Sequence, residues 1–391
     1  MGEVSEQERG AGVTRRDRGT PMSAFDYPLP AGSIAQRPVE PRSAARLLVA
    51  PEVSPVGVLE HRRVAELPVL LGPGDVVVVN ETRVLAARLG LVRSTGGRAE
   101  VLLLEPVAGT AGGVAGWRRA DAAVGVRAEG GGSRWYALVR PGRRLPPGTL
   151  LYACGPDGRP TGEPVVEVGV AAPGADDGRR LVTVLDRSAA RSVGEVPLPP
   201  YIHEPLDDPD RYQTVFARDE DEADRSVAAP TAGLHLTREV IDGIVAAGAS
   251  VHRVELAIGL DTFRPVTTEV AEDHVIHTER YRVPAATLEA CRAARRVVAV
   301  GTTVVRALES AAATGALEGR TDLFIHGSYP FALVDVVLTN FHLPRSSLLL
   351  LVEAFCGPRW RDLYATALAE GYRFLSFGDA MLVGRSYREP T

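Results

Sequence analysis

The sequence contains no lysine, so all 44 of its basic side chains are arginines. A Schiff base to a carbonyl substrate and a Walker-type phosphate loop both require lysine, and both are therefore excluded. The formal net charge is −5, which indicates that the molecule as a whole is not a generic nucleic-acid binder. A local cluster of arginines is still compatible with that charge.

Cysteines and long apolar runs are also scarce. Cys154, Cys291 and Cys356 lie far apart and form no CxxC pair, which excludes a disulfide framework and a zinc–thiolate site. No apolar run approaches the roughly 18 residues that a membrane span needs, and the first residues lack the apolar segment of a secretory signal. We therefore expect a cytoplasmic protein without a membrane segment.

Several common catalytic motifs are missing. No GxGxxG opens a helix and no GxSxG elbow is present, so neither a dinucleotide fingerprint nor a serine nucleophile is indicated. His274 and His277 lie three residues apart, but no HExxH and no cysteine partner accompanies them. We expect no metal site there.

Composition divides the 391 residues into three parts. Residues 1–22 are polar and aperiodic, which predicts a disordered tail. Residues 70–187 contain short strands separated by glycine and proline turns, typical of a small antiparallel β-barrel. Residues 23–69 and 188–391 are predicted to form an α/β domain, a mixed sheet covered by helices, into which the barrel is inserted.

One polar loop stands out within the α/β part. The apolar run 331–338 ends in a polar and aromatic cluster, after which Pro344 prevents an earlier helix start and Ser346 is placed to cap a helix. Loops at the carboxyl ends of strands bind ligands in α/β folds. The residues of this cluster are Thr339, Asn340, Phe341 and His342.

A second loop has features of an anion site. Gly301, Thr302 and Thr303 stand directly before a helix, and Arg306 lies one turn further on. Free N–H groups and the positive end of the helix dipole suit a carboxylate or a phosphate. An ordinary helix cap explains this loop equally well when it is taken alone.

Four histidines, the natural acids and bases near neutral pH, lie in such loops or in adjoining polar segments. They are His235, His274, His277 and His342.

At these loops the chain closely resembles the S-adenosylmethionine:tRNA ribosyltransferase-isomerases of queuosine synthesis, in family order over about residues 25–383. The matching segments are 34–38, 42, 46–48, 80, 82–84, 87–89, 196–202, 212–215, 228–235, 262–263, 265–266, 272–274, 301–303, 305–306, 308–310, 335, 338–344, 372–374 and 378–381.

The resemblance implies an α/β domain interrupted by a small antiparallel β-barrel. It also implies that S-adenosylmethionine is consumed as a ribosyl donor, without a further cofactor. The amine of 7-aminomethyl-7-deazaguanine in the tRNA anticodon receives the isomerised ribosyl unit, and adenine and methionine leave. The sulfonium acidifies the neighbouring CH₂, so one positioned base can form an ylide that expels adenine. We expect the protein to act as a monomer.

Site residues follow from the same resemblance. His235 or His342 is the expected base, with Asp261 as a third candidate. The donor is expected to bind at Thr231, Gly233, Thr262, Phe263, Gly301, Thr302, Thr303, Arg306, Thr339, Asn340 and Phe341. The arginines expected to contact the tRNA anticodon stem-loop are Arg37, Arg42, Arg46, Arg83 and Arg88.

Two features depart from the family pattern. The family has a histidine and a glycine where this chain has Ala257 and Asp261, and the acidic run 219–224 enlarges a loop that is shorter in the family. Extra negative charge disfavours polyanionic tRNA. The alternatives are a paralogue that uses a small-molecule amine or merely cleaves S-adenosylmethionine, and a non-catalytic binding protein.

Overall fold

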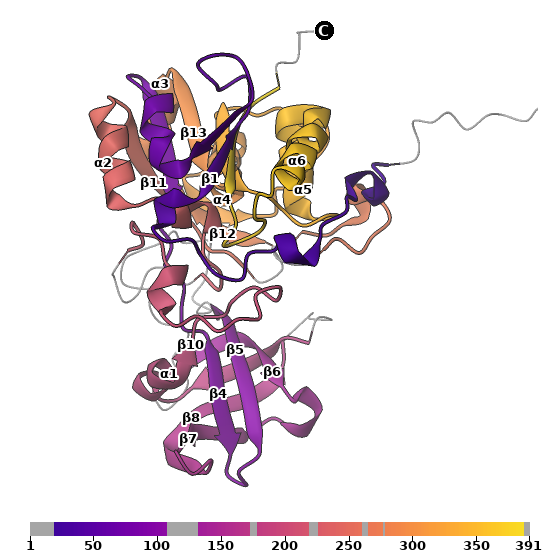
Figure 1. Cartoon of the computed structure of the whole chain (residues 1–391). Coiled ribbons are helices and arrows are strands. Elements are labelled where there is room, and N and C mark those ends of the chain that lie inside the picture. The colour runs from indigo at the N-terminus through magenta and orange to yellow at the C-terminus, as the bar shows by residue number, and fades with distance from the viewer. Residues whose placement is uncertain are drawn as a thin grey trace, which may run out of the picture.

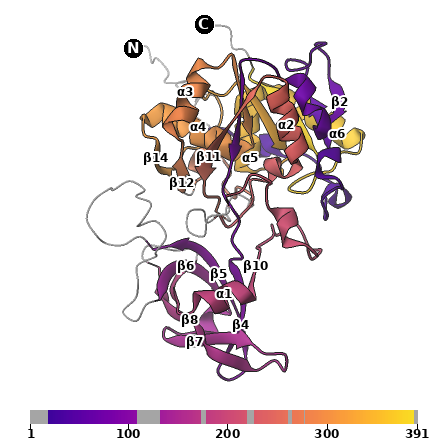
Figure 2. The ribbon, with the colours of Figure 1, turned by 90° about the vertical axis from the view of Figure 1, so that its left-hand side faces the viewer.

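The structure is a computed structural model that describes residues 19–107, 132–172, 178–218, 226–259, 265–276 and 278–386. It has two lobes, an α/β domain above and a β-barrel below (Figure 1). The view turned by 90° shows the same separation (Figure 2). In the described parts, no helix is long and apolar enough to cross a membrane.

A mixed sheet of nine strands forms the centre of the α/β domain, in the order β14-β12-β11-β3-β13-β15-β16-β1-β2. The neighbouring strands β11, β3, β13 and β15 are parallel, whereas β15 and β16 are antiparallel. The strands are β1 (Arg46–Val49), β2 (Glu60–Arg63), β3 (Asp75–Asn80), β11 (Ser250–Leu256), β12 (Glu279–Arg282), β13 (Arg296–Val300), β14 (Glu318–Thr321), β15 (Val336–Asn340) and β16 (Ala380–Gly384).

Helices cover this sheet. Every residue of β3 is buried, as expected for a central strand with both faces covered. The α-helices are α2 (Arg238–Ala246), α3 (Ala285–Ala293), α4 (Thr302–Thr314), α5 (Ser347–Cys356) and α6 (Trp360–Ala369). The 3-10 helices are η1 (Met22–Phe25), η2 (Ala31–Ser33), η3 (Arg42–Ala44), η4 (Val64–Leu70), η6 (Pro209–Tyr212), η7 (Thr231–His235), η9 (Ala271–Asp273) and η10 (Gly357–Arg359).

The predicted helix start at Ser346 is confirmed, and helix α2 begins with a cap of the same kind. The Thr237 side chain accepts a hydrogen bond from the Val240 N–H and caps α2. Ser346 accepts from the Leu349 N–H in the same way and caps α5. These caps fix the two segments that leave the sheet edge near the pocket described below.

The second lobe is an antiparallel barrel. Its strands follow the order β10-β4-β5-β6-β9-β8-β7, and a further pairing of β4 with β7 closes six of them into a ring. The elements are β4 (Arg88–Arg93), β5 (Arg98–Pro106), β6 (Ser133–Arg140), η5 (Gly142–Arg144), β7 (Thr149–Cys154), β8 (Pro160–Ala171), β9 (Arg180–Val184), α1 (Arg187–Val193) and β10 (Gly194–Glu195). An α/β domain with an inserted barrel was predicted, and that fold class is confirmed.

The predicted barrel boundaries, 70–187, are wrong at both ends. Strand β3 lies in the middle of the nine-stranded sheet, between β11 and β13, and α1 and β10 beyond residue 187 pack with the barrel (Figure 1). Local sequence marks β3 as a buried strand, but its partners are more than 160 residues away and decide which sheet it joins.

The predicted tail, 1–22, is too long. Met22 is fully buried, and the Thr20 hydroxyl and N–H both donate to the Glu272 carboxylate. Residues 1–18 lie outside the described ranges. The ordered chain therefore begins before residue 23, because a single apolar side chain anchors an otherwise polar segment in the core.

Candidate active site

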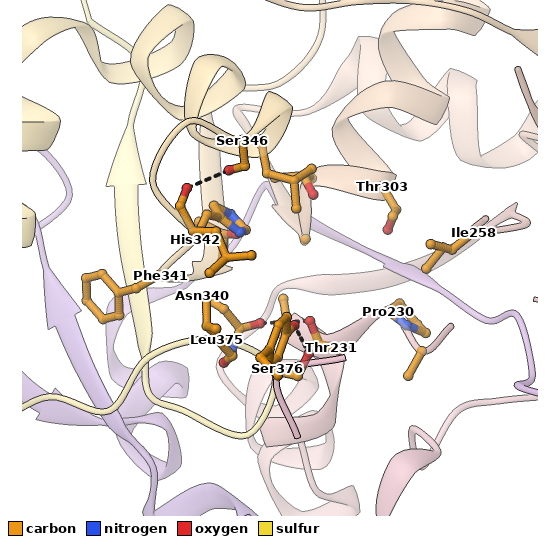
Figure 3. A pocket seen from close by; sticks show the side chains of 18 residues that line it. Pro230, Thr231, Ile258, Thr303, Asn340, Phe341, His342, Ser346, Leu375 and Ser376 are labelled. Carbon is orange, nitrogen blue, oxygen red and sulfur yellow. Dashed lines mark hydrogen bonds between the residues drawn. The ribbon is translucent and has the colours of Figure 1, made fainter. Parts of the chain in front are cut away.

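A pocket lies where parallel strands β13 and β15 end at the same edge of the sheet (Figure 3). Strand β13 leads into α4, and β15 leads into the loop that carries His342. His342 and Leu375 lie on one side of the pocket, and Thr303 and Ile258 lie across from them. The lining residues are Tyr201, Ala229, Pro230, Thr231, Ala232, Ile258, Gly301, Thr302, Thr303, Thr339, Asn340, Phe341, His342, Leu343, Ser346, Leu348, Leu375 and Ser376.

One wall is the N-terminus of α4. Gly301 has φ 94° and offers no capping side chain, and this positive φ is strained for residues other than glycine. The Gly301 N–H donates to the Leu338 carbonyl at 2.8 Å. Within the described chain the N–H groups of Thr302 and Thr303 have no protein acceptor. Both residues line the pocket, so these two donors and the positive end of the helix dipole are available to a ligand there.

His342 lines the opposite side. Its Nε2 lies 2.9 Å from the Thr339 hydroxyl, and its main chain is held by the hydroxyls of Tyr364 and Tyr27, which contact its N–H and carbonyl respectively. Its other ring nitrogen, Nδ1, makes no hydrogen bond to any residue in the described ranges. One imidazole nitrogen is therefore available to a ligand.

His235 lies behind this surface rather than on it. It is buried and does not line the pocket. Its Nε2 is 3.0 Å from the Asn340 Nδ2, and Asn340 in turn accepts a hydrogen bond from the Thr231 hydroxyl at 3.1 Å. Asn340 and Thr231, not His235, are the groups of this network that reach the pocket.

Burial controls the ionisation of both imidazoles. It lowers the pKa of His342 to about 3. Burial also lowers the pKa of His235 to about 4, with the negative charge of Asp379 opposing it and the positive charges of Arg373 and Arg42 adding to it. Both side chains are neutral near pH 7, and each can offer a lone pair only as an uncharged imidazole.

Three predicted donor-binding residues are used elsewhere. The Arg306 guanidinium pairs with the buried Glu279 carboxylate and donates to the Leu323 carbonyl at 3.1 Å. The Phe341 ring is fully buried and stacks on Phe374 at 4.7 Å between centroids, so it points away from the pocket (Figure 3). A Cβ on Gly233 would lie 2.7 Å from the Phe216 ring, so this glycine serves close packing.

Other predicted residues fall outside the described ranges. These are Asp261, Thr262, Phe263, His277 and the acidic run 219–224. His274 is described, and its ring meets the Phe324 ring edge-on at 5.5 Å. Of the predicted donor-binding set, the structure brings Thr231, Gly301, Thr302, Thr303, Thr339 and Asn340 to the pocket, and Phe341 also lines it although its ring packs on Phe374.

The predicted tRNA-binding arginines have different partners. Arg37 contacts Glu204 and Asp207, and its carbonyl accepts from Arg373. Arg46 lies 3.8 Å from the centroid of the Tyr372 ring. Arg42 donates to the carbonyls of Asp210 and Gln213. The Arg83 guanidinium lies 3.9 Å from the Asp210 carboxylate. Arg88 lies on barrel strand β4.

The segment 375–376 was not predicted to belong to the site. Leu375 has φ 68°, an unusual conformation for leucine that tends to occur where the backbone serves a site. Its carbonyl accepts from Asn340 Nδ2 at 3.1 Å, and the neighbouring Ser376 hydroxyl is 2.8 Å from the Tyr201 hydroxyl. The family-matching segments 372–374 and 378–381 lie on either side, but the residues Leu375 and Ser376 themselves match no motif that would indicate a site.

The fold and the pocket define an α/β enzyme whose site combines the N-terminus of a helix with a neutral imidazole. Residues 22–383 match the family of queuosine biosynthesis proteins, and the chain belongs to that family, as the sequence resemblance predicted.

Its similar relatives include two S-adenosylmethionine:tRNA ribosyltransferase-isomerases. The one from Moorella thermoacetica is 47% identical over 377 residues, covering 93% of this chain and 99% of the relative. The one from Thermus thermophilus is 45% identical over 374 residues, with coverage of 93% and 99%. A crystal structure of S-adenosylmethionine tRNA ribosyltransferase from Thermotoga maritima matches with a TM-score of 0.47 and 33% identity, covering 92% of this chain and 99% of that one.

Proposed function

We propose that this enzyme transfers the ribosyl unit of S-adenosylmethionine to the amine of 7-aminomethyl-7-deazaguanine in tRNA and isomerises it to an epoxycyclopentanediol. Adenine and methionine are the other products. The observation that carries the proposal is the neutral His342 imidazole in a pocket that also holds the free N–H groups of Thr302 and Thr303. The names of the relatives support the same reaction.

The donor carries three charged groups, a carboxylate, an ammonium and a sulfonium, and the pocket offers a wall for the carboxylate. Its carboxylate suits the N-terminus of α4, where the Thr302 and Thr303 N–H groups and the helix dipole favour negative charge. In this proposal S-adenosylmethionine is a consumed substrate, and no further cofactor takes part. Since Arg306 is paired with Glu279, backbone donors rather than a guanidinium bind the carboxylate.

His342 is the proposed base. With Nε2–H donating to the Thr339 oxygen, its Nδ1 lone pair is free to accept a proton. It takes this proton from the CH₂ between sulfur and the ribose, and the electron pair left on carbon drives elimination of adenine. The acceptor amine then attacks the sugar unit, and closure of the epoxide expels methionine as the leaving group. Each step uses only the donor, the acceptor and one base.

The acceptor side is supported by arginines close to the pocket. The Gln36 side chain donates to the carbonyl of the pocket residue Tyr201 at 2.9 Å, and Arg37 is the next residue in the chain. The Arg46 guanidinium donates to the Glu370 carbonyl and has no carboxylate partner in the described part of the chain. Guanidinium contacts to phosphates supply most of the affinity for RNA. We propose that these arginines hold the anticodon stem-loop, and that the enzyme acts as a cytoplasmic monomer.

Adenine release tests the proposal against its alternative. The enzyme is incubated with S-adenosylmethionine, with and without anticodon stem-loop RNA that carries 7-aminomethyl-7-deazaguanine, and adenine is measured by chromatography. Release that requires the modified RNA supports the transferase. Equal release without RNA supports an enzyme that uses a small-molecule acceptor or cleaves its donor.

A further inference from the structure

The hydrogen bonds around Asn340 define its orientation without ambiguity. The Leu375 carbonyl can only accept, and it lies 3.1 Å from one terminal atom of the Asn340 amide. That atom must therefore be the nitrogen, Nδ2. The Leu375 carbonyl is itself held in place, because it also accepts from the Gly378 N–H at 2.9 Å.

This orientation fixes the tautomer of His235. For the second hydrogen of Asn340 Nδ2 the nearest partner is His235 Nε2 at 3.0 Å, closer than the Asp379 carbonyl at 3.5 Å. Since the amide nitrogen has no lone pair to accept with, His235 Nε2 must be the acceptor, and the ring hydrogen must sit on Nδ1. An apolar or protonated side chain at position 235 would remove this acceptor and release the amide.

The same orientation determines what the pocket presents. With its nitrogen directed toward Leu375 and His235, Asn340 turns Oδ1 toward Thr231, whose hydroxyl donates to it at 3.1 Å. That hydroxyl hydrogen is then used, so Thr231 Oγ1 has only lone pairs left for a ligand. Thr231 and Asn340 both line the pocket, and their side-chain oxygens can act as acceptors.

We propose that His235 is a positioning residue, which holds Asn340 so that Asn340 Oδ1 and Thr231 Oγ1 together accept hydrogen bonds from bound S-adenosylmethionine. This inference rests on the proposed function. The groups recognised are N–H or O–H donors, which the ligand carries on its ribose, its adenine and its ammonium group. The α4 N-terminus offers donors instead, so the two walls bind different groups of the ligand.

The tautomer is measured first, in the unmodified protein. Long-range nitrogen–hydrogen NMR spectra of histidine-labelled protein distinguish Nδ1–H from Nε2–H imidazoles. We expect the His235 signal to be that of an Nδ1–H ring, without change between pH 5 and pH 8. A ring protonated on Nε2 would overturn the inference, whatever the ligand proves to be.

Ligand recognition is measured next, by calorimetry with S-adenosylhomocysteine and with analogues that each lack one donor group: a ribose hydroxyl, the adenine amine or the amino-acid ammonium. Thr231→Val keeps the shape and removes the hydroxyl. We expect it to weaken S-adenosylhomocysteine about tenfold, the effect of about one hydrogen bond. For the analogue that lacks the recognised group, the same substitution should have no effect.

Conservative variants separate positioning from folding. We expect His235→Phe to weaken the ligand as Thr231→Val does, and His235→Gln, whose side-chain oxygen can take the place of Nε2, to restore most of the affinity. Thr231→Ser keeps the hydroxyl and serves as the matched control. Binding that is unchanged in both Thr231→Val and His235→Phe would overturn the inference. If the unmodified protein binds none of these ligands, the proposed function fails, while the NMR result still decides the orientation of Asn340.

Discussion

Two buried histidines within one small region are the most consequential single residues of this protein. Both are neutral because burial disfavours the imidazolium. They nevertheless have different roles, since only His342 lines the pocket and His235 contacts the back of Asn340. The two histidines therefore differ in position rather than in pKa: His342 is the proposed base, and His235 is the residue proposed to orient Asn340.

Replacing His342 is the direct test of the base. We expect His342→Gln to lower the rate of adenine release more than tenfold, because it removes the one imidazole among the described residues that line the pocket. The affinity for S-adenosylmethionine, measured by calorimetry, should change much less. His252→Gln, on strand β11 and outside the pocket, is the matched control. A His342→Gln enzyme with normal turnover would require a different base.

The same histidines make stability depend on pH. Their pKa values in the folded protein, about 3 and about 4, lie below the ordinary value of about 6.5. At pH values between the folded pKa values and about 6.5, the unfolded chain binds more protons than the folded protein does. The free energy of unfolding therefore falls as the pH falls below about 6.5. Each histidine contributes up to about 1.4 kcal/mol per pH unit.

Chemical denaturation at pH 7 and pH 5 measures this effect. The loss of stability over that interval should be smaller in the double variant His235→Gln/His342→Gln than in the unmodified protein. An identical loss in both proteins would mean that the two rings are not buried in their neutral form.

At the scale of the elements, helix α4 provides the proposed carboxylate site at its N-terminus, next to Gly301. Its two ends provide a matched experiment, since Gly301 and Gly315 have φ of 94° and 71°. Alanine at either position should destabilise the protein by about 1–2 kcal/mol, because its Cβ disfavours a positive φ. Only Gly301→Ala should also weaken S-adenosylmethionine, since Gly301 sets the direction of the N–H groups that face the pocket.

Thermal unfolding and calorimetry of the two variants check this expectation. Equal loss of stability with unequal loss of ligand affinity is the expected pattern. If Gly315→Ala weakened the ligand as much as Gly301→Ala, the effect would come from general destabilisation and not from the helix start.

Elements with local causes were predictable from sequence. The caps at Thr237 and Ser346 and the turn at Gly301 depend on neighbouring residues, and the structure contains all three. The assignment of β3 to the barrel was wrong, because its sheet is decided by distant strands. The partner of Arg306 and the approach of Leu375 to Asn340 also come from distant parts of the chain, so no local pattern could indicate them.

At the scale of the whole molecule, the net charge is −5, so RNA binding depends on individual arginines rather than on overall charge. We expect Arg46→Gln to weaken anticodon stem-loop RNA and to reduce the slope of log affinity against log salt by about 1, as for one lost phosphate contact. Arg37→Gln should have a smaller effect, because Glu204 and Asp207 already offset its charge. Binding is measured by fluorescence anisotropy at several salt concentrations.

Arg159 provides the control for this surface. It lies in the turn between barrel strands β7 and β8, and its side chain is 84% exposed. Arg159→Gln should leave both the RNA affinity and its salt slope unchanged. If it behaved as Arg46→Gln does, the RNA would be attracted by overall charge rather than by the arginines beside the pocket.

The mass of the RNA product tests the central claim most directly. The enzyme is incubated with S-adenosylmethionine labelled with carbon-13 in all five ribose carbons and with stem-loop RNA that carries 7-aminomethyl-7-deazaguanine. The mass of the RNA is then measured by mass spectrometry. We expect a gain of one ribosyl-derived unit that contains the whole label, matched by one adenine released for each RNA modified. An RNA that gains only an unlabelled methyl group, or adenine released while the RNA mass is unchanged, would contradict ribosyl transfer.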